Sequence, residues 1–264
     1  MTNSIGDIFL ELAGDTRISI LKTLETNSCR ASKLSESLNL TAQETHRNLE
    51  RLVESDLVIK KSDSFLTLTS YGKVVVQNIS VFNFLHNNKK YFLNHSTTGL
   101  NEKFIQRLGD LNDSHYVKGV FVILETWKDI AKNAKKYIKV ISSEIPVTFF
   151  PILVDMAQKG VIIYQIHGEN TIVPTNFKEK LTDSNLRKLI VDKKFQRKMI
   201  KKVTVIGVIN ETECSLSFPY LNEIADIDGG FASKNPKAQG WFEDYFDEVW
   251  KNADDYDVSK IKTE

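Results

Sequence analysis

Apolar residues recur at three- and four-residue intervals after Thr41, and a strand-like pattern replaces this spacing after residue 54. Thr41 and Glu44 have the spacing of a capping box, in which each side chain bonds a free backbone N–H at the start of a helix. The inward positions counted from Thr41 are Thr45, Leu49, Leu52 and Val53. The pattern therefore predicts an amphipathic helix over residues 42–54 with a polar outer face.

This outer face carries small or hydrogen-bonding side chains of the kind that enter the major groove of DNA. They are Ala42, Gln43, His46, Arg47 and Asn48. Two β-prone runs follow, 57–60 and 65–68, joined by a polar tip at 61–64. We call this predicted hairpin the wing. Two shorter helical patterns precede residue 41, carrying Ile20 and Leu24 in the first and Leu34 in the second.

Three helices followed by a hairpin resemble the winged-helix, helix-turn-helix regulators of the arsenic-repressor type, over residues 1–69. The resemblance implies that the helix 42–54 reads double-stranded DNA and that the wing contacts phosphates. The residues expected at the DNA are Thr41, Ala42, Gln43, His46, Arg47, Asn48, Arg51, Lys60, Lys61 and Ser62. Each also has a plainer interpretation, since Arg51, like Glu50, is a charge that solvent can accommodate on an ordinary helix.

The charge of this head does not by itself indicate nucleic acid, because acidic residues balance the basic ones. Phosphate binding would depend on local placement of cations, with Arg30 and Lys33 as further candidates. A winged helix used for protein contact therefore stays open as an alternative.

The chain has 264 residues, 41% hydrophobic residues and a formal net charge of +1, which suits a small head and a larger second domain. Its sequence contains no apolar window long enough to span a membrane and no secretion-signal pattern at Met1–Ser4, so we expect a cytoplasmic protein without membrane contact. Cys29 and Cys214 stand far apart without a CxxC pair or a histidine cluster. We expect no disulfide, metal or cofactor.

An apolar segment, 74–85, follows the wing and is predicted to be a linker helix that also forms a homodimer contact. Its candidate contact residues are Val75, Ile79, Phe82, Phe84 and Leu85. The polar stretch 86–99 is predicted to be a hinge, so the linker region covers 70–99.

Residues 100–253 have the pattern of an α/β domain, and 254–264 are predicted to be a polar tail. Helical patterns at 101–108 and 117–134 lead to a strand at 137–141, a helix at 147–159 and a strand at 161–166. This order indicates a βαβ unit with parallel strands. A helix near 183–189, strands at 203–209 and 214–218, and a closing helix at 236–252 follow. The aromatic stripe of the closing helix, which includes Trp241, is expected in the core.

The second domain resembles the sensor domain of archaeal winged-helix regulators related to the methanogenesis-regulatory protein. The residues that carry this resemblance are Tyr116–Val120, Ala134–Ile138, Gly160–Val161, Asp228–Gly229, Pro236, Trp241, Phe246 and Trp250. It implies a phospholipase-D-like fold, whose enzymes cleave phosphodiesters with a His-x-Lys motif. None of the five histidines here is followed by lysine two positions later. We therefore predict a non-catalytic domain, with a phosphodiester hydrolase carrying a targeting head as the alternative.

A small anionic effector is the candidate ligand of this domain. Its candidate residues are Ser142, Ser143, His167, Glu169, Arg187 and Lys194. His167 follows a predicted parallel strand, where α/β sheets bind ligands, although a surface-loop histidine is the alternative. The basic run 187–202 would attract an effector or DNA phosphates, or else form a solvated helix face. The sequence as a whole predicts a homodimeric transcription regulator that reads a pseudo-palindromic operator and is modulated through its second domain.

Overall fold

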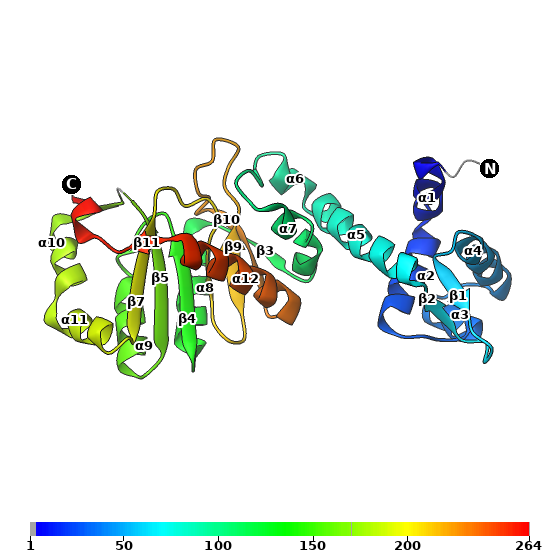
Figure 1. Cartoon of the computed structure of the whole chain (residues 1–264), viewed down its shortest axis with the longest axis horizontal. Coiled ribbons are helices and arrows are strands. Elements are labelled where there is room, and N and C mark those ends of the chain that lie inside the picture. The colour runs from blue at the N-terminus through cyan, green and yellow to red at the C-terminus, as the bar shows by residue number, and fades with distance from the viewer. Residues whose placement is uncertain (1–3, 170, 264) are drawn as a thin grey trace. The chain divides into compact units, whose positions relative to one another are not determined.

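The computed structural model describes residues 4–169 and 171–263, which form two compact units (Figure 1). The first unit ends at Asn83 and is called the head below, and the second begins at Phe84. Helix α5, Ser70–Asn87, contains this boundary. The boundary therefore lies inside a helix, shortly before the stretch 86–99 in which the hinge was predicted.

The head is built from four helices, a hairpin and the first turns of α5. Its elements are α1 (Ile5–Leu12), α2 (Asp15–Thr26), α3 (Ala31–Ser37), α4 (Ala42–Glu54), β1 (Val58–Lys60) and β2 (Leu66–Leu68). β1 and β2 pair antiparallel and form the wing, with Ile59 opposite Thr67. The order α2, α3, α4 and hairpin confirms the predicted sequence of three helices and a hairpin, with α1 as an additional helix at the start.

One apolar core holds the head together and explains why each helix is amphipathic. Ile20 and Leu21 of α2 and Leu52 of α4 are completely buried in it, beside the hairpin residues Leu66 and Leu68. α5 contributes Val76 and Ile79 to the same core. Val53 was predicted to face inward, but it is 40% exposed because its position on α4 falls beyond the buried stripe.

The second unit is built on an eight-stranded mixed sheet with the order β11-β7-β5-β4-β8-β9-β10-β3. Its strands are β3 (His115–Lys118), β4 (Tyr137–Ser142), β5 (Ile162–Gly168), β7 (Phe195–Ile200), β8 (Ile206–Ile209), β9 (Cys214–Ser217), β10 (Gly229–Ser233) and β11 (Asp254–Asp255). β4, β5 and β7 run parallel, and the other pairs are antiparallel. The predicted parallel βαβ unit is therefore confirmed.

Helices cover both faces of this sheet. They are α6 (Lys89–Phe92), α7 (Glu102–Ile105), α8 (Val120–Asn133), α9 (Phe150–Gln158), α10 (Thr175–Lys178), α11 (Ser184–Val191) and α12 (Pro236–Asn252), with 3-10 turns η1 (Leu108–Leu111), η2 (Glu179–Thr182) and η3 (Val258–Lys260). Lys139 of β4 bonds Glu243 of α12, whereas Ser142, on the opposite face of β4, lies near α8. α12 therefore covers one face, and α8, in contact with α9, covers the other (Figure 1).

Three parts of the second unit differ from the sequence prediction. The helix predicted from 117 begins at Val120, because β3 precedes it and Gly119 turns the chain at φ +106°. β7 and β10 were not predicted. The polar tail predicted at 254–264 is also wrong within the described residues, because β11 pairs with β7, and β12 (Lys262–Thr263) pairs with β6 (Ile172–Val173).

Candidate nucleic-acid interface

Helix α4 begins at the residue that the sequence predicted. The Thr41 hydroxyl accepts a hydrogen bond of 3.1 Å from the backbone N–H of Glu44, so it satisfies one of the free donors of the first turn. This bond is one half of the capping box. Thr45 and Leu49 are buried behind it, which fixes the rotation of α4 about its own axis.

Four of the predicted contact residues on α4 face solvent together: Ala42, Gln43, His46 and Arg47. Asn48 does not, which corrects the prediction that it belongs to this outer face. It is 6% exposed, its amide nitrogen donates to the Glu44 carbonyl at 2.9 Å, and its amide oxygen accepts from Arg17 at 3.3 Å. Asn48 therefore connects α4 to α2 and is not free to read a base.

Arg51 is also engaged within the head. Its Nε and Nη2 donate to the two carboxylate oxygens of Glu11 at 3.0 and 2.6 Å, and this partner raises the pKa of Arg51. Arg17 donates to the carbonyls of Glu11 and Leu10 at the end of α1. A fork-to-fork pair of this kind is directional and specific. Arg51 thus holds α1 against α4, a role for which the sequence offered no signal because the partners are 40 residues apart.

The wing presents its predicted residues to solvent, since Lys60, Lys61 and Ser62 are exposed. The Lys61 N–H donates to the Phe65 carbonyl at 2.8 Å, and the Asp63 carboxylate accepts from the Phe65 N–H at 3.1 Å. These bonds close the turn and leave the two lysine ammonium groups outside it.

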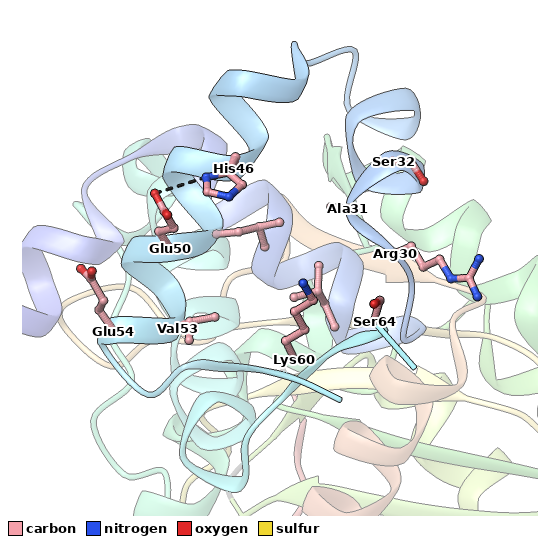
Figure 2. Close-up of a pocket in the computed structure, with 11 residues that line it drawn as sticks. Arg30, Ala31, Ser32, His46, Glu50, Val53, Glu54, Lys60 and Ser64 are labelled. Carbon is pink, nitrogen blue, oxygen red and sulfur yellow. Dashed lines mark ion pairs between the residues drawn. The ribbon is translucent and has the colours of Figure 1, made fainter. Parts of the chain in front are cut away.

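A hollow of about 570 Å³ lies between α4, the wing and the start of α3 (Figure 2). Its floor is apolar and includes Leu49, Val53 and Leu66. Figure 2 shows Lys60 rising from the wing toward the α4 side, with Arg30 at the start of α3. The Arg30 guanidinium lies 5.2 Å from the centre of the Phe65 ring, which is a cation–π distance.

The α4 side of the hollow is acidic. It carries Glu50 and Glu54, and His46 Nδ1 lies 3.3 Å from a Glu50 carboxylate oxygen (Figure 2). The head as a whole has ten acidic residues and eight lysines and arginines within positions 1–69. Because acidic residues outnumber the basic ones, any phosphate contact depends on local cations such as Lys60, Lys61 and Arg30.

The five residues predicted to form the linker and dimer contact differ in burial and belong to both units. Ile79 is buried in the head core, and Val75 packs against that core. Phe84 is 1% exposed in the second unit, with its ring centre 5.3 Å from that of Phe231, and Leu85 is half-buried. Phe82 is 61% exposed, so among the five it is the one available to a second copy of the chain.

The six candidate effector residues also do not form one site. Ser142 and His167 are neighbours on β4 and β5, with 3.4 Å between Ser142 Oγ and His167 Nδ1, and Ser143 follows Ser142. Glu169 pairs with Lys260 at 2.6 Å. Lys194 precedes β7 and so lies at the opposite end of the parallel strands, roughly 16 Å away at 3.3 Å per residue. Arg187 is exposed on α11.

His167 is not in a surface loop, because it is completely buried on β5. Burial, and second the charge of Arg197, lower its pKa to about 3, so the ring is neutral at physiological pH. Its Nε2 has no hydrogen-bond partner among the described residues, and neither do Gln165 Oε1 and the Tyr256 hydroxyl. The Tyr256 ring covers this group, 3.9 Å from the Arg197 guanidinium carbon.

The basic run 187–202 is split between two elements, which corrects its interpretation as one helix face. Its first part lies on α11, and its second part forms β7. On β7, Lys198 donates to the carbonyls of Trp250 and Ala253 at the end of α12, at 2.9 and 3.2 Å. This lysine satisfies a helix terminus and is not a free phosphate contact.

Among the residues that the structure describes, no group of three or more histidine, cysteine or acidic side chains is arranged to hold a metal ion. The helices of the described ranges are each too short or too polar to cross a membrane.

No protein-family model matches the sequence, and no curated protein matches it. Among solved structures, the archaeal chromatin protein TrmBL2, described as having a novel mode of DNA binding, is similar at 13% identity and a TM-score of 0.44, over 92% of this chain and 94% of its own. Two others are the phospholipase D family member Nuc from Salmonella typhimurium (12% identity, TM-score 0.38) and NucT from Helicobacter pylori (8% identity, TM-score 0.40). Each covers 54% of this chain and 98% of its own. TM-scores below 0.5 establish neither a shared fold nor a shared function.

Proposed function

We propose that this protein is a transcription regulator that binds double-stranded DNA through α4 and the wing of a winged-helix head. The observation that carries the proposal is a pair of exposed polar surfaces in the head: α4 exposes Gln43, His46 and Arg47, and the wing exposes Lys61 beside Lys60, which lines the hollow between α4 and the wing. A helix fits the major groove, and an adjacent hairpin then meets the neighbouring backbone.

Side-chain chemistry indicates which of these residues would contact bases and which would contact phosphates. Arg47 offers the planar fork that bonds guanine O6 and N7, and Gln43 offers an amide that matches adenine. Lys60 and Lys61 on the wing, and Arg30 at the start of α3, are cations suited to contacts with the phosphate backbone. Arg30, Arg47, Lys60 and Lys61 are the four cations expected at the DNA. Each neutralised phosphate contributes about −0.9 to the slope of the logarithm of the binding constant against the logarithm of salt concentration, so this slope should be no steeper than about −3.6.

A homodimer would place two α4 helices on a pseudo-palindromic operator. The support for it is the exposure of large apolar side chains in the head, with Phe82 of α5 at 61% and Ile5 and Leu10 of α1 at 76% and 60%. Exposed apolar groups of this size, when gathered into a patch, mark interaction surfaces.

The second unit is proposed to regulate this binding and not to catalyse a reaction. We assign it the phospholipase-D-like class on the sequence resemblance, without the His-x-Lys motif of the enzymes. Its two buried histidines are held by the protein itself. His167 is enclosed in the sheet. His95 Nδ1 lies 2.7 Å from the Tyr91 carbonyl oxygen, and His95 Nε2 lies 2.9 Å from an Asp226 carboxylate oxygen. Neither is open to a substrate.

Fluorescence anisotropy with the gene's own upstream DNA and a scrambled duplex tests the proposal, with salt varied in both titrations. Arg47→Ala should weaken binding to the preferred sequence by about 1–3 kcal/mol, and Arg47→Lys should keep the charge but lose the preference. Lys61→Ala should weaken both duplexes equally. Lys132→Ala, which removes an exposed cation from α8, is the matched control and should change neither.

If Arg47→Ala and Lys61→Ala both bind the two duplexes as tightly as the wild type does, DNA binding through this face is refuted. Capture of a protein partner that Arg47→Ala abolishes, without DNA binding, would instead support the alternative that the head makes protein contacts.

The proposed homodimer is tested separately by measuring the oligomeric state. Phe82→Glu places a charge on the exposed apolar position and should shift the protein from dimer to monomer in analytical ultracentrifugation, whereas Val191→Glu, at an 80% exposed position on α11, should not. A wild-type monomer at all concentrations would exclude this part of the proposal.

A further inference from the structure

Arg197, the third residue of β7, is a half-buried cation without an acidic partner. It pairs with Gln165 of β5 in the sheet, so its side chain lies on the face that holds the buried side chains of Gln165 and His167. Among the described residues, no carboxylate forms an ion pair or a hydrogen bond with the guanidinium. Taking a charge out of water without a partner is unfavourable, so an anion from outside the chain would stabilise this arrangement.

Two contacts fix the plane of the Arg197 guanidinium. Its Nη1 donates to the Leu181 carbonyl of η2 at 3.1 Å. Its central carbon lies 3.9 Å from the centre of the Tyr256 ring, which is a cation–π distance. Tyr256 directly follows β11, whose pairing with β7 brings it beside Arg197. The group is therefore held in one orientation before any ligand arrives, which lowers the entropy cost of binding.

One edge of this guanidinium is free. Nε and Nη2 have no hydrogen-bond partner among the described residues, and neither atom is fully buried, so both keep accessible surface. The unpartnered atoms of His167, Gln165 and Tyr256 are fully buried and are therefore out of reach of a ligand. Nε and Nη2 lie on the same side of the guanidinium and form the fork that bonds both oxygens of a carboxylate.

A carboxylate with a single charge matches this edge. Arg51 in the head shows the same geometry, because its Nε and Nη2 donate to the two carboxylate oxygens of Glu11 at 3.0 and 2.6 Å. Burial lowers the pKa of Arg197, and Tyr256 acts in the opposite direction; no lysine, further arginine or carboxylate of the described residues contributes. The site thus offers one positive charge, and a phosphate dianion would bring a second negative charge without a partner.

We propose that Arg197 binds the carboxylate of a small monoanionic ligand through Nε and Nη2. The ligand supplies the counter-ion that the fold does not. This site differs from the six effector residues predicted from the sequence, because Arg197 was not among them. The role of such a ligand in regulation rests on the proposed function, but its binding does not.

Arginine Nε–H resonances measure this binding directly in the full-length protein labelled with ¹⁵N-arginine. The chain has seven arginines, and Arg197→Lys identifies the signal that matters by removing it. The probe is sodium acetate, compared with acetamide and with sodium chloride at equal ionic strength. We expect acetate to shift the Arg197 signal saturably. Acetamide, which has the same shape without the charge, and chloride, which lacks the two oxygens, should bind at least tenfold more weakly. The Arg51 signal should stay in place because Glu11 occupies its fork.

Thermal unfolding followed by tryptophan fluorescence extends the test to variants, because all three tryptophans lie in the second unit. Acetate should raise the unfolding midpoint of the wild type more than chloride does, since a ligand that binds the folded state stabilises it. Arg197→Met should abolish this difference. Arg187→Met, at an exposed position on α11, is the matched control and should keep it. If Arg197→Met gives no cooperative transition, Arg197→Lys replaces it, since it keeps the charge but loses the planar fork and should weaken acetate binding at least tenfold.

An Arg197 signal that does not move with acetate, or moves equally with acetamide or chloride, would overturn the proposal. An undiminished acetate effect in a folded Arg197 variant would overturn it too, and so would tighter binding of phosphate than of acetate. Because these titrations contain no DNA, failure of the DNA assay with a normal acetate shift would refute the proposed function alone.

Discussion

Removing the buried imidazole of His167 should make the second unit markedly less sensitive to acid. In the folded chain its pKa is lowered to about 3, first by burial and second by the charge of Arg197, whereas the unfolded chain takes up the proton near pH 6.5. Between these values the unfolded state binds more protons than the folded state. The free energy of unfolding therefore falls as the pH falls below 6.5.

The magnitude follows from the two pKa values. At pH 7.5 the histidine contributes almost nothing, and at pH 5 the cost of keeping it neutral is about 2 kcal/mol, rising to about 4 kcal/mol at pH 3. Because the ring is completely buried, solvent does not screen this effect. His167→Phe keeps an aromatic ring in the same space and removes the titration, so the stability it loses between pH 7.5 and pH 5 should be about 2 kcal/mol smaller.

Urea unfolding followed by tryptophan fluorescence isolates the relevant unit, because all three tryptophans lie after Phe84. The comparison uses the difference between the two pH values within each protein, which cancels any constant effect of the substitution on packing. His115→Asn, at an exposed position on β3, is the control and should lose as much stability as the wild type. Equal losses in wild type and His167→Phe would refute the reasoning that His167 is held neutral by burial.

Two further substitutions test the packing of each unit. Trp241→Ala should lower the free energy of unfolding by about 3–5 kcal/mol in the same urea assay, because this completely buried ring stacks on Tyr245 and bonds Phe104; an unchanged midpoint would contradict its place in the core. Gly72→Ala should destabilise the head by about 1–3 kcal/mol, since its new Cβ would lie near 2.1 Å from the Leu57 carbonyl oxygen. Circular dichroism should show an earlier head transition for Gly72→Ala, with the tryptophan-detected transition unmoved.

The head could be predicted largely from local sequence because its signals are local. The bond from Glu44 N–H to Thr41 spans three residues, and the wing closes within a short turn. The errors occurred where a distant partner decides the role. Asn48 and Arg51 have the composition of a DNA-reading face, yet Arg17 and Glu11 engage them.

The same reason explains why β7 was missed in the second unit. A buried strand is expected to be apolar, but β7 carries Arg197 and Lys198, whose charges are accommodated by the Tyr256 ring and by the end of α12. These partners come 50 or more residues later in the chain. Without them the run has the appearance of a solvated basic helix, and residues 254–263 have that of a free tail.

Apolar patterning has a further limit. Ile123 and Trp127 recur at helical spacing on α8, and this spacing predicts burial without distinguishing a side chain that fills a core from one that surrounds a space. Both residues line a hollow of about 200 Å³ between α8 and the sheet. The sequence pattern therefore predicts that this face of α8 is covered, but not that a space is left beneath it.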